Sequence, residues 1–374
     1  MICRSIALRE FRNVTEAKVD FSEGVNLICG ENAQGKTNLL EAVYYCSVGR
    51  SFRTSVGAEM IRFGSPFAKV EMEYTETGRT RDQHLSFTLF RDKRRVAERN
   101  GVRIERMSEL VGSFRTVLFC PEHLSLIKDG PGMRRTYLDM AISGLYPMYM
   151  HALQNYHHIL RQRNALIKNA PFDRATFDAT VELWSRKLAH EAAIIAEARL
   201  AYVKRASEQM ALCFADMTGE REKPSMVYDG SSGQPEEEYA DRKRTEERYV
   251  QLLTSSYDRE IAVGATLWGI HKDDLTIRLN GKNARIYASQ GQQRSLALSM
   301  KLAEGEICRE EFGDEPVLLL DDVLSELDRG RREYLVSRIK GKQVILTTCE
   351  EQERTGTGAD KRIRVCGGCY EEES

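Results

Sequence analysis

Glycines, a lysine and a threonine near the start of the chain form a phosphate-binding pattern. Residues 30–37 read GENAQGKT, which fits the spacing GxxxxGK followed by Ser or Thr. Glycines let the backbone approach phosphate oxygens, and N–H groups at the start of the next helix attract the anion. Lys36 is expected to neutralise the β- and γ-phosphates, and the hydroxyl of Thr37 to ligate Mg²⁺. The predicted nucleotide-binding residues of this loop are Gly30, Glu31, Asn32, Ala33, Gln34, Gly35, Lys36, Thr37 and Asn38.

The flanking residues favour this interpretation over an ordinary glycine-rich turn. Residues 25–29 (VNLIC) are typical of a buried strand, and residues 38–43 (NLLEAV) continue as a helix. A strand, a glycine-rich turn and a helix are the elements that such a loop requires. The sequence therefore predicts a site for ATP and Mg²⁺.

A second acidic pattern lies near the end of the chain. Residues 317–322 (VLLLDD) predict a buried strand that carries two carboxylates at its C-terminal edge. Asp321 is expected to hold Mg²⁺, and Asp322 to orient or deprotonate the attacking water, so that Lys36 and Asp322 are the predicted catalytic residues. By itself the string also fits a surface turn. Since Thr37 and Asp321 must reach one ion, the chain has to leave the nucleotide fold and return to it.

A third pattern is a helix start that suits an anion. Ser289 begins the string SQGQQRS, and an apolar helix follows. Serine is a favourable N-cap, and a glycine in the first turn lets a phosphate approach the positive end of the helix. A routine helix cap is the alternative. The residues predicted to contact the nucleotide of a second copy are Ser289, Gln290, Gly291 and Gln292.

Together these strings are similar to the nucleotide-binding motifs of ABC-type ATPases, in the branch of the structural maintenance of chromosomes proteins. Their order and wording most closely resemble the RecF family of bacterial DNA replication and repair ATPases, over nearly the whole chain. The strings that carry the resemblance are FRN at 11–13, GENAQGKTNLLEA at 30–42, RSFRT at 50–54, GIHKDDL at 269–275, ASQGQQRSLAL at 288–298 and LLLDDVLSELD at 318–328.

The resemblance implies a fold and an assembly. The fold is α/β, a P-loop ABC-type ATPase head split by a mainly helical insertion that contains a helical hairpin. Two copies are expected to clasp two ATP molecules, with the P-loop of one copy facing the helix start at Ser289 of the other. Arg12 and Asn13 would lie beside the nucleotide. Ser325 and Asp328 would belong to the D-loop, which crosses the dimer seam.

Three departures from the family pattern bear on the chemistry. Asp322 stands where many relatives in the wider superfamily carry glutamate, and the shorter acid suggests slow hydrolysis. No histidine follows the strand expected at 344–347; Cys349 lies in that region, so the γ-phosphate sensor is unassigned. GIHKDDL resembles a GPHRDD-type string of the family, with Ile270 in place of proline and Lys272 in place of arginine. Within it, His271 is either a sensor between the lobes or a hydrogen-bonded structural residue.

The resemblance also implies partners. The family supports recombinase loading at single-strand gaps together with RecR and RecO, in DNA damage repair and the SOS response. Duplex DNA and gap junctions are thus the expected ligands, and a basic segment at 91–106 could neutralise their phosphates. A solvated hairpin face is the alternative for this segment. The predicted DNA contacts are Arg50, Arg53, Arg94 and Arg95.

The overall composition narrows the class of protein. The 374 residues are 41% apolar and carry 55 Lys and Arg against 56 Asp and Glu, a net charge of −1. A strongly basic protein held on nucleic acid by bulk charge is therefore excluded, and DNA binding needs a local patch. No apolar run is long enough to span a membrane, and nothing suggests export, so a cytoplasmic location without membrane partners is expected.

The nine cysteines are scattered, and reduced core thiols are their expected state. Cys366 and Cys369 form one CxxC beside an acidic tail that is expected to be frayed. Zinc would need two further ligands, so neither a zinc nor a redox role is expected for the pair.

The periodicity of the chain predicts three parts: an ATPase lobe over 1–123, a helical insertion over 124–284, and completion of the ATPase over 285–374. The first part alternates like a sheet, with turns at Thr77-Gly78 and Asn100-Gly101. In the insertion, Pro147 and Pro171 are expected to limit the helices to about 40 residues. The expected strands are 2–8, 25–29, 67–74, 85–90, 117–119, 317–320 and 344–347, and the expected helices include 236–260, one from Gln290 and one after Asp328.

Other classes of P-loop protein are less consistent with these patterns. A transporter-type ABC ATPase would carry a typical LSGGQ string and no long helical insertion. A P-loop phosphotransferase would leave the SQGQ segment unexplained. A nuclease of the overcoming-lysogenization type needs an additional carboxylate-rich metal domain, which the sequence does not indicate.

Overall fold

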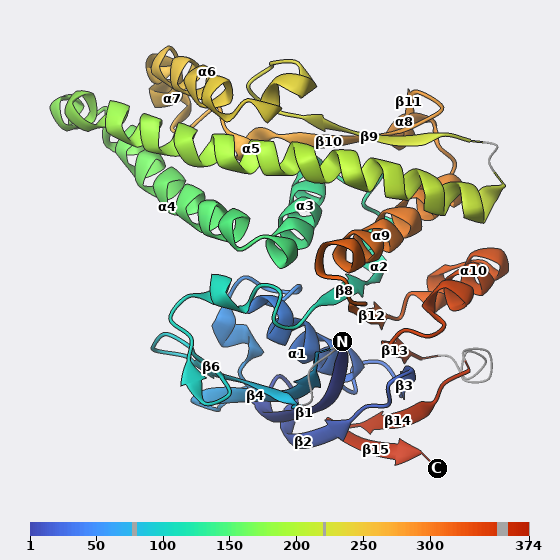
Figure 1. Ribbon diagram of the computed structural model, residues 1–374. Helices are drawn as coiled ribbons and strands as arrows, with labels where there is room; N and C mark the ends of the chain where they lie inside the picture. Colours follow the sequence, from blue (N-terminus) through green and yellow to red (C-terminus); the bar gives the residue numbers. More distant parts are fainter. Residues whose placement is uncertain (77–80, 220–221, 350–357, 374) are drawn as a thin grey trace. The chain divides into compact units, whose positions relative to one another are not determined.

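A computed structural model describes residues 1–76, 81–219, 222–349 and 358–373 of the chain (Figure 1). The chain forms two compact units, residues 1–125 with 301–374 and residues 126–300. The second boundary lies later than the sequence predicts, since residues 285–300 group with the helical unit. The division falls within helix α9 (Gln290–Phe312), which continues past residue 300.

A parallel sheet at the centre of the first unit carries the predicted nucleotide loop. Its strand order is β15-β14-β3-β13-β12-β8, and all neighbours are parallel except the β14–β15 hairpin. The strands β3, β12 and β13 are buried at every position, as their apolar runs predict. Their bounds are β3 Val25–Cys29, β8 Thr116–Phe119, β12 Val317–Asp321, β13 Val344–Thr348, β14 Lys361–Cys366 and β15 Cys369–Glu373.

An antiparallel sheet forms the rest of the β-structure in this unit, in the order β2-β1-β4-β5-β6-β7. The turn predicted at Asn100-Gly101 is confirmed, because both residues have positive φ between β6 and β7. The turn predicted at Thr77-Gly78 lies outside the described residues. The bounds are β1 Ile2–Phe11, β2 Val14–Asp20, β4 Phe67–Thr75, β5 Gln83–Phe90, β6 Val96–Arg99 and β7 Val102–Arg103.

Short helices complete the first unit and connect the strands. Helix α1 follows the predicted P-loop, and α10 begins after Asp328, whose side chain accepts a hydrogen bond from the Arg331 N–H. The helices are α1 Lys36–Val48, α2 Pro121–Leu124 and α10 Arg329–Ile339, with short 3-10 turns at Gly57–Met60, Met107–Leu110 and Leu324–Glu326.

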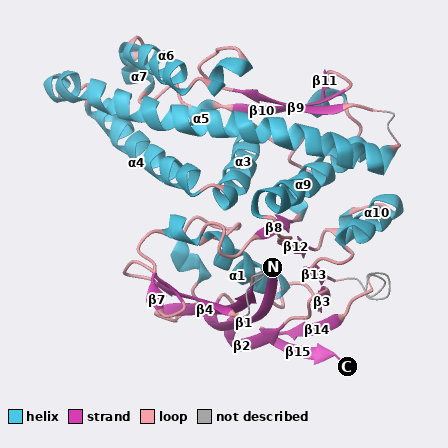
Figure 2. Cartoon of the chain, in the orientation of Figure 1, coloured by secondary structure: helices cyan, strands magenta, loops and turns pink. Residues whose placement is uncertain are grey.

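Long helices dominate the second unit (Figure 2). Helix α5 has 45 residues, longer than the predicted limit, because neither proline nor glycine interrupts the chain between its N-cap Asp173 and its left-handed C-cap Gly219. Helix α4 packs against α5 as the predicted hairpin. The long helices are α3 Pro131–Leu145, α4 Pro147–Asn169 and α5 Arg174–Thr218.

The remaining elements of this unit correct two predictions. A three-stranded antiparallel sheet, β11-β10-β9, lies in the region predicted as helical. The single helix predicted over 236–260 is broken at the N-cap Asp241 and again at Ser255. The elements are β9 Pro224–Asp229, α6 Arg242–Thr254, α7 Tyr257–Val263, β10 Asp274–Leu279, β11 Lys282–Asn283 and α8 Ala284–Tyr287, with 3-10 turns at Glu236–Ala240 and Ile270–Lys272. Within the described ranges, no helix combines the length and apolarity needed to cross a membrane.

Candidate nucleotide-binding site

The loop between β3 and α1 has the conformation that its sequence requires. Ala33 and Gly35 have φ of 63° and 121°, and a Cβ on Gly35 would lie 3.0 Å from Asn13 Oδ1. The ammonium of Lys36 donates to the carbonyls of Gly30 (2.7 Å) and Glu31 (2.8 Å). The positive charge therefore lies against the loop that would wrap phosphates, at the start of α1.

The β14–β15 hairpin forms hydrogen bonds with this loop. The N–H groups of Gly367 and Gly368 donate to the Gln34 side chain (2.7 Å) and carbonyl (3.0 Å), and the hydroxyl of Tyr370 donates to Gly35 O (2.9 Å). The prediction of a frayed tail is wrong, because β14 pairs with β3 and Cys366 with Cys369 lie opposite each other across the hairpin. In the described part of the chain, no group of three His, Cys, Asp or Glu side chains is arranged to hold a metal ion.

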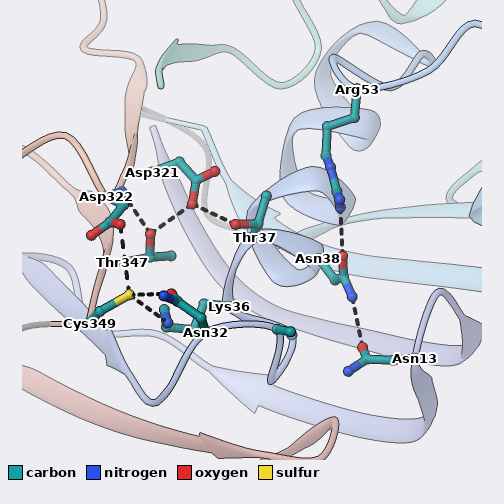
Figure 3. Close-up of a pocket in the computed structure, with 12 residues that line it drawn as sticks. Asn13, Asn32, Lys36, Thr37, Asn38, Arg53, Asp321, Asp322, Thr347 and Cys349 are labelled. Atoms are coloured by element: carbon teal, nitrogen blue, oxygen red, sulfur yellow. Dashed lines mark hydrogen bonds between the residues drawn. The ribbon is translucent and has the colours of Figure 1, made fainter. Parts of the chain in front are cut away.

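The predicted metal ligands contact each other despite their separation in sequence. Thr37 Oγ1 donates to Asp321 Oδ1 at 2.9 Å, and Thr347 Oγ1 donates to the same oxygen at 2.8 Å (Figure 3). Burial raises the pKa of Asp321, and the neighbouring Asp322 carboxylate adds to this, while the two threonine hydroxyls oppose it. A hydroxyl and a carboxylate at one point fit Mg²⁺, which takes oxygen ligands, and the ion would supply charge neutralisation for a phosphoryl group.

Asp322, the residue directly after β12, has a strained backbone conformation. Its φ is 51°, a left-handed value that Asp and Asn tolerate better than most residues. Its N–H donates to Thr347 Oγ1 (2.9 Å), so the residue is fixed by the neighbouring strand. Aspartate in place of glutamate is consistent with this backbone geometry.

Cys349 occupies the position after β13 where the sequence pattern lacked a histidine. Its Sγ lies 3.1 Å from Lys36 Nζ, 2.8 Å from Asn32 Oδ1 and 3.7 Å from Asp322 Oδ2. The thiol thus contacts the loop, the lysine and the acidic pair together. The sequence pattern did not identify Cys349 and Thr347 as site residues, although Cys349 directly follows β13 and Thr347 is its penultimate residue, at the sheet edge where ligands bind.

A buried glutamate organises the other side of the site. Glu41 on α1 has a fully buried side chain and accepts from Arg12 Nε (2.8 Å) and Nη2 (2.6 Å). Arg53 Nη1 contacts Glu41 at 3.4 Å and Asn38 Oδ1 at 2.8 Å, and Asn38 donates to Asn13 Oδ1 at 2.7 Å. Glu41 was missed as a site residue; its place on α1, four positions after Thr37, is the signal that could have shown it.

The P-loop, the acidic pair and the end of β13 surround a cavity of about 350 Å³. Most of the predicted nucleotide residues line it, while Gly30, Glu31 and Gln34 support the loop through their carbonyls and Arg12 binds Glu41. The lining residues are Asn13, Asn32, Ala33, Gly35, Lys36, Thr37, Asn38, Arg53, Asp321, Asp322, Thr347 and Cys349.

The predicted D-loop begins at the same strand end. Ser325 Oγ donates to the carbonyl of Asp322 at 2.8 Å, and the side chains of Ser325 and Asp328 are exposed. Asp328 also caps α10. The turn is therefore tied to the acidic pair, and its polar side chains are exposed to solvent.

In the second unit, the helix start at Ser289 is built as a reciprocal cap. Ser289 Oγ accepts from the Gln292 N–H (3.2 Å), and Gln292 Oε1 accepts from the Ser289 N–H (2.7 Å). This confirms the N-cap predicted for Ser289. Ser289 and Gln290 are exposed and Gly291 is half-buried. Two large apolar side chains beside them, Ile286 (70%) and Tyr287 (69%), are also exposed.

The GIHKDDL segment lies within a polar network of the second unit. Buried Asp273 accepts from Arg199 Nη1 (3.2 Å) and from the hydroxyl of Tyr228. His271 bonds Tyr156 Oη through Nδ1 (2.6 Å) and Thr266 O through Nε2 (3.2 Å). Both ring nitrogens are thus paired, which favours the structural role for His271 over the sensor.

We expect His271 to make the stability of the second unit depend on pH. Burial, with the charges of Lys272 and Arg135, lowers its pKa from 6.5 to about 4. The imidazole therefore takes up a proton below about pH 6.5 in the unfolded chain but only near pH 4 in the folded chain. The free energy of unfolding consequently falls as pH drops from about 6.5 toward 4. The free energy of unfolding of His271→Gln should therefore vary less with pH in this window, by about 3 kcal/mol, when measured by thermal unfolding. Exposed His158→Gln is the control, and identical profiles for both variants and wild type would contradict the assignment.

The four predicted DNA contacts differ in their surroundings. Arg53 lines the nucleotide cavity, and Arg95 Nη1 bonds Tyr45 Oη (2.8 Å) and the Gly49 carbonyl. Arg50 is half-buried, and Arg94 is exposed on the turn between β5 and β6. DNA contact by these residues stays a prediction, with Arg94 the best placed of the four.

The chain matches the RecF/RecN/SMC N terminal domain family over residues 2–367. It is 38% identical over 359 residues to the DNA replication and repair protein RecF of Ruminiclostridium cellulolyticum, covering 95% of this chain and 94% of that protein. The chain belongs to the RecF family. RecF of Bacillus pumilus is likewise 38% identical over 349 residues, 93% of each chain.

Solved structures agree with this family. A structure described as the recombination mediator protein RecF-ATPrS in the RecFOR pathway has a TM-score of 0.92 at 34% identity and covers 100% of this chain and 98% of its own. The head of an Smc protein bound to the C-winged helix domain of ScpA shares the fold, with a TM-score of 0.56 at 16% identity over 100% of this chain and 97% of its own. The chain is thus an ATPase of the RecF and SMC type, with RecF relatives in DNA replication and repair, and the transporter and phosphotransferase alternatives are set aside.

Proposed function

We propose that this RecF-family chain is an ATP-dependent DNA-binding protein of recombinational repair and replication maintenance. ATP and Mg²⁺ binding would close a homodimer on duplex DNA and gap junctions, and slow hydrolysis would open it. The closed dimer would support recombinase loading at single-strand gaps. RecR, with RecO, is the proposed partner, because the similar solved RecF structures are described as members of the RecFOR pathway.

The observation that carries the proposed dimer is the surface around Ser289. A helix start with exposed polar residues and two exposed large apolar side chains, Ile286 and Tyr287, fits a contact with a nucleotide held by another copy. In the first unit, the cavity at Lys36 and the exposed Ser325 offer the complementary half. A γ-phosphate bound by both copies would favour the dimer, because a ligand shifts an equilibrium only by its differential affinity for the two states.

The proposed DNA contact rests on the antiparallel sheet of the first unit. Exposed basic side chains gather at residues 91–106, among them Lys93, Arg94, Arg103 and Arg106. The net charge of the whole chain is −1, so one copy attracts DNA weakly. Two such patches brought together by ATP would contact more phosphates and bind DNA more tightly.

We expect sedimentation to show a dimer at saturating ATP and Mg²⁺, and DNA affinity to rise at least tenfold over that with ADP at matched salt. Arg94→Ser with Arg103→Ser should weaken ATP-dependent binding about tenfold and reduce the salt slope by about 1 per lost phosphate contact. Arg186→Ser, an exposed change on α5, is the matched control. A monomer at every protein concentration, or DNA affinity independent of ATP, would contradict the proposal.

A further inference from the structure

Two exposed cysteines lie opposite each other where the β14–β15 hairpin turns, close to the C-terminus (Figure 1). Cys366 is the last residue of β14, and Cys369 is the first residue of β15. The two glycines between them have φ of 56° (Gly367) and 83° (Gly368), the positive values of a tight type I′ turn. Side chains of directly opposed residues project from the same face of a sheet, so the two thiols are neighbours.

This cysteine pair has the spacing that a disulfide requires. Opposed residues of an antiparallel pair have Cα atoms about 4.5–5.5 Å apart, within the range of about 4.4–6.8 Å that a disulfide spans. Both thiols are free and exposed, so an oxidant can reach them. Six other cysteines are buried, and the third exposed one is Cys349. The sequence spacing alone predicted no redox role, because it placed the pair beside a frayed tail and not across a fixed hairpin.

The turn between the two cysteines holds the P-loop. The N–H of Gly367 donates to Gln34 Oε1 (2.7 Å), and the N–H of Gly368 donates to Gln34 O (3.0 Å). On its other side the turn is closely packed, because a Cβ on Gly368 would lie 2.9 Å from the carbonyl oxygen of Asn13. Asn13 Nδ2 also donates to Gln34 O (3.0 Å). The turn, the P-loop and Asn13 therefore form one tightly packed group.

Closing a disulfide must move this turn. Opposed residues have Cβ atoms about 4.5–5.5 Å apart, whereas a disulfide holds them at about 3.8 Å, so oxidation draws the ends of the turn together by about 1 Å. Gly368 has no room to move toward Asn13. The displacement therefore falls on the hydrogen bonds to Gln34, because close-packed groups transmit such shifts to their neighbours.

We propose that Cys366 and Cys369 form a reversible disulfide that weakens nucleotide binding at the P-loop. The effect on binding rests on the proposed function, since it takes the P-loop as the nucleotide site. Reversible disulfides of this kind are typical of redox sensing in reducing compartments. The cysteine pair is thus a modification site that lies outside the nucleotide cavity and acts on it through Gln34.

A small-molecule disulfide, such as oxidised glutathione, is the oxidant that this chemistry needs. The thiolate of one cysteine attacks a glutathione sulfur, the glutathione S–S bond breaks, and one glutathione leaves. The thiolate of the second cysteine then attacks the protein sulfur of the mixed disulfide and releases the second glutathione. Two protein thiols thus lose two electrons and two protons, which the two glutathione thiols take up, and reduced glutathione reverses the exchange.

The first measurement asks whether the disulfide forms. The full chain is equilibrated with mixtures of oxidised and reduced glutathione, free thiols are alkylated, and the chain is digested with trypsin. Cleavage after Arg364 leaves both cysteines in the peptide 365–374. We expect this peptide to lose both alkylation sites together as the mixture becomes more oxidising, and to regain both with dithiothreitol.

The second measurement asks whether the disulfide acts on the P-loop. Calorimetry should show ADP binding about fivefold weaker in the oxidised chain, the effect of losing the net contribution of one hydrogen bond, with recovery in dithiothreitol. The control is the variant that combines Cys366→Ser with Cys369→Ser, treated in the same way. It keeps Cys349, so any loss that it shows on oxidation belongs to that thiol, and the wild type should lose about fivefold more.

The other outcomes overturn the inference. A peptide 365–374 that stays fully alkylated in excess oxidised glutathione shows that the disulfide does not form. Equal ADP affinity in the oxidised and reduced chains, or an equal loss in the double variant, removes the effect on the P-loop. If the reduced wild type binds no ADP, the proposed function fails and the effect on binding fails with it, while the alkylation pattern still decides whether the disulfide forms.

Discussion

Lys36→Ala is expected to weaken ATP binding about a hundredfold and to abolish the ATP-dependent dimer. The ammonium is buried against the loop, and its acceptors are the carbonyls of Gly30 and Glu31. A hydrogen bond from the ammonium to an anionic phosphate is stronger than these bonds to uncharged carbonyls, so its loss costs about 1.5–3 kcal/mol. Nucleotide titration checks the result, with Lys168→Ala on the exposed face of α4 as the control.

The same variant tests whether two copies share each site. Ser289→Arg places a long cation at the helix start and should block the surface offered to a neighbouring nucleotide, while its own P-loop stays intact. Either variant alone should fail to form a productive dimer. A mixture of the two should recover about a quarter to a half of wild-type ATP hydrolysis, because a mixed dimer keeps one undamaged site.

An active Ser289→Arg variant, or a mixture no more active than its components, would count against shared sites. If each chain hydrolyses ATP alone, Ser289→Arg should be active by itself and mixing should add nothing. A double variant that carries both changes in one chain serves as the control, because mixing it with either single variant leaves no intact site. Thermal unfolding of each variant separates misfolding from lost chemistry.

Much of the first unit follows from simple patterns in the sequence. The strands that carry Cys29, Asp321 and Thr347 are buried at every position, and such strands appear as unbroken apolar runs. Polar residues directly after these runs must lie at one edge of a parallel sheet. For this reason the contact between Thr37 and Asp321 could be predicted although most of the chain separates them.

Other parts of the site had no local signal. The β14–β15 hairpin, which contacts the P-loop, buries only alternate residues of β14, Ile363 and Val365. Its acidic end has a composition that is typical of an unstructured tail. Pairing with β3 stabilises it, and a tertiary contact of this kind cannot be read from spacing. Cys349 likewise gains its place only from the end of β13, because no motif assigns a cysteine to that position.

The second unit shows a similar limit. The helix predicted over 236–260 contains neither proline nor glycine, yet it is interrupted where Asp241 caps α6 by accepting from the Arg244 N–H at 3.0 Å. An aspartate can stop one helix and start another without a change in composition. The strands β9 and β10 are short, and long neighbouring helices dominate the periodicity of that region.

Asp322→Asn is expected to lower the rate of ATP hydrolysis about a hundredfold while ATP affinity stays within about threefold. A carboxylate that orients or deprotonates the attacking water contributes about a hundredfold or more to the rate, and the amide cannot accept the proton. Asparagine keeps the size of the side chain and tolerates the φ of 51° at this position, so the backbone and the bond to Thr347 should persist. Alanine would remove the polar group and add backbone strain, which makes it a poorer test.

The proposed clamp gives this variant a second measurable consequence. If hydrolysis opens the dimer, Asp322→Asn should still bind ATP and form the dimer. The lifetime of its complex with DNA should then increase by about the same factor as its rate of hydrolysis decreases. Asp20→Asn, the same chemical change on an exposed residue at the end of β2, should behave as wild type. A normal rate of ATP hydrolysis in Asp322→Asn would show that another group near Cys349, and not Asp322, orients or deprotonates the attacking water. If hydrolysis is slow but DNA is released at the wild-type rate, hydrolysis does not open the dimer. Release of DNA would then follow dissociation of the nucleotide.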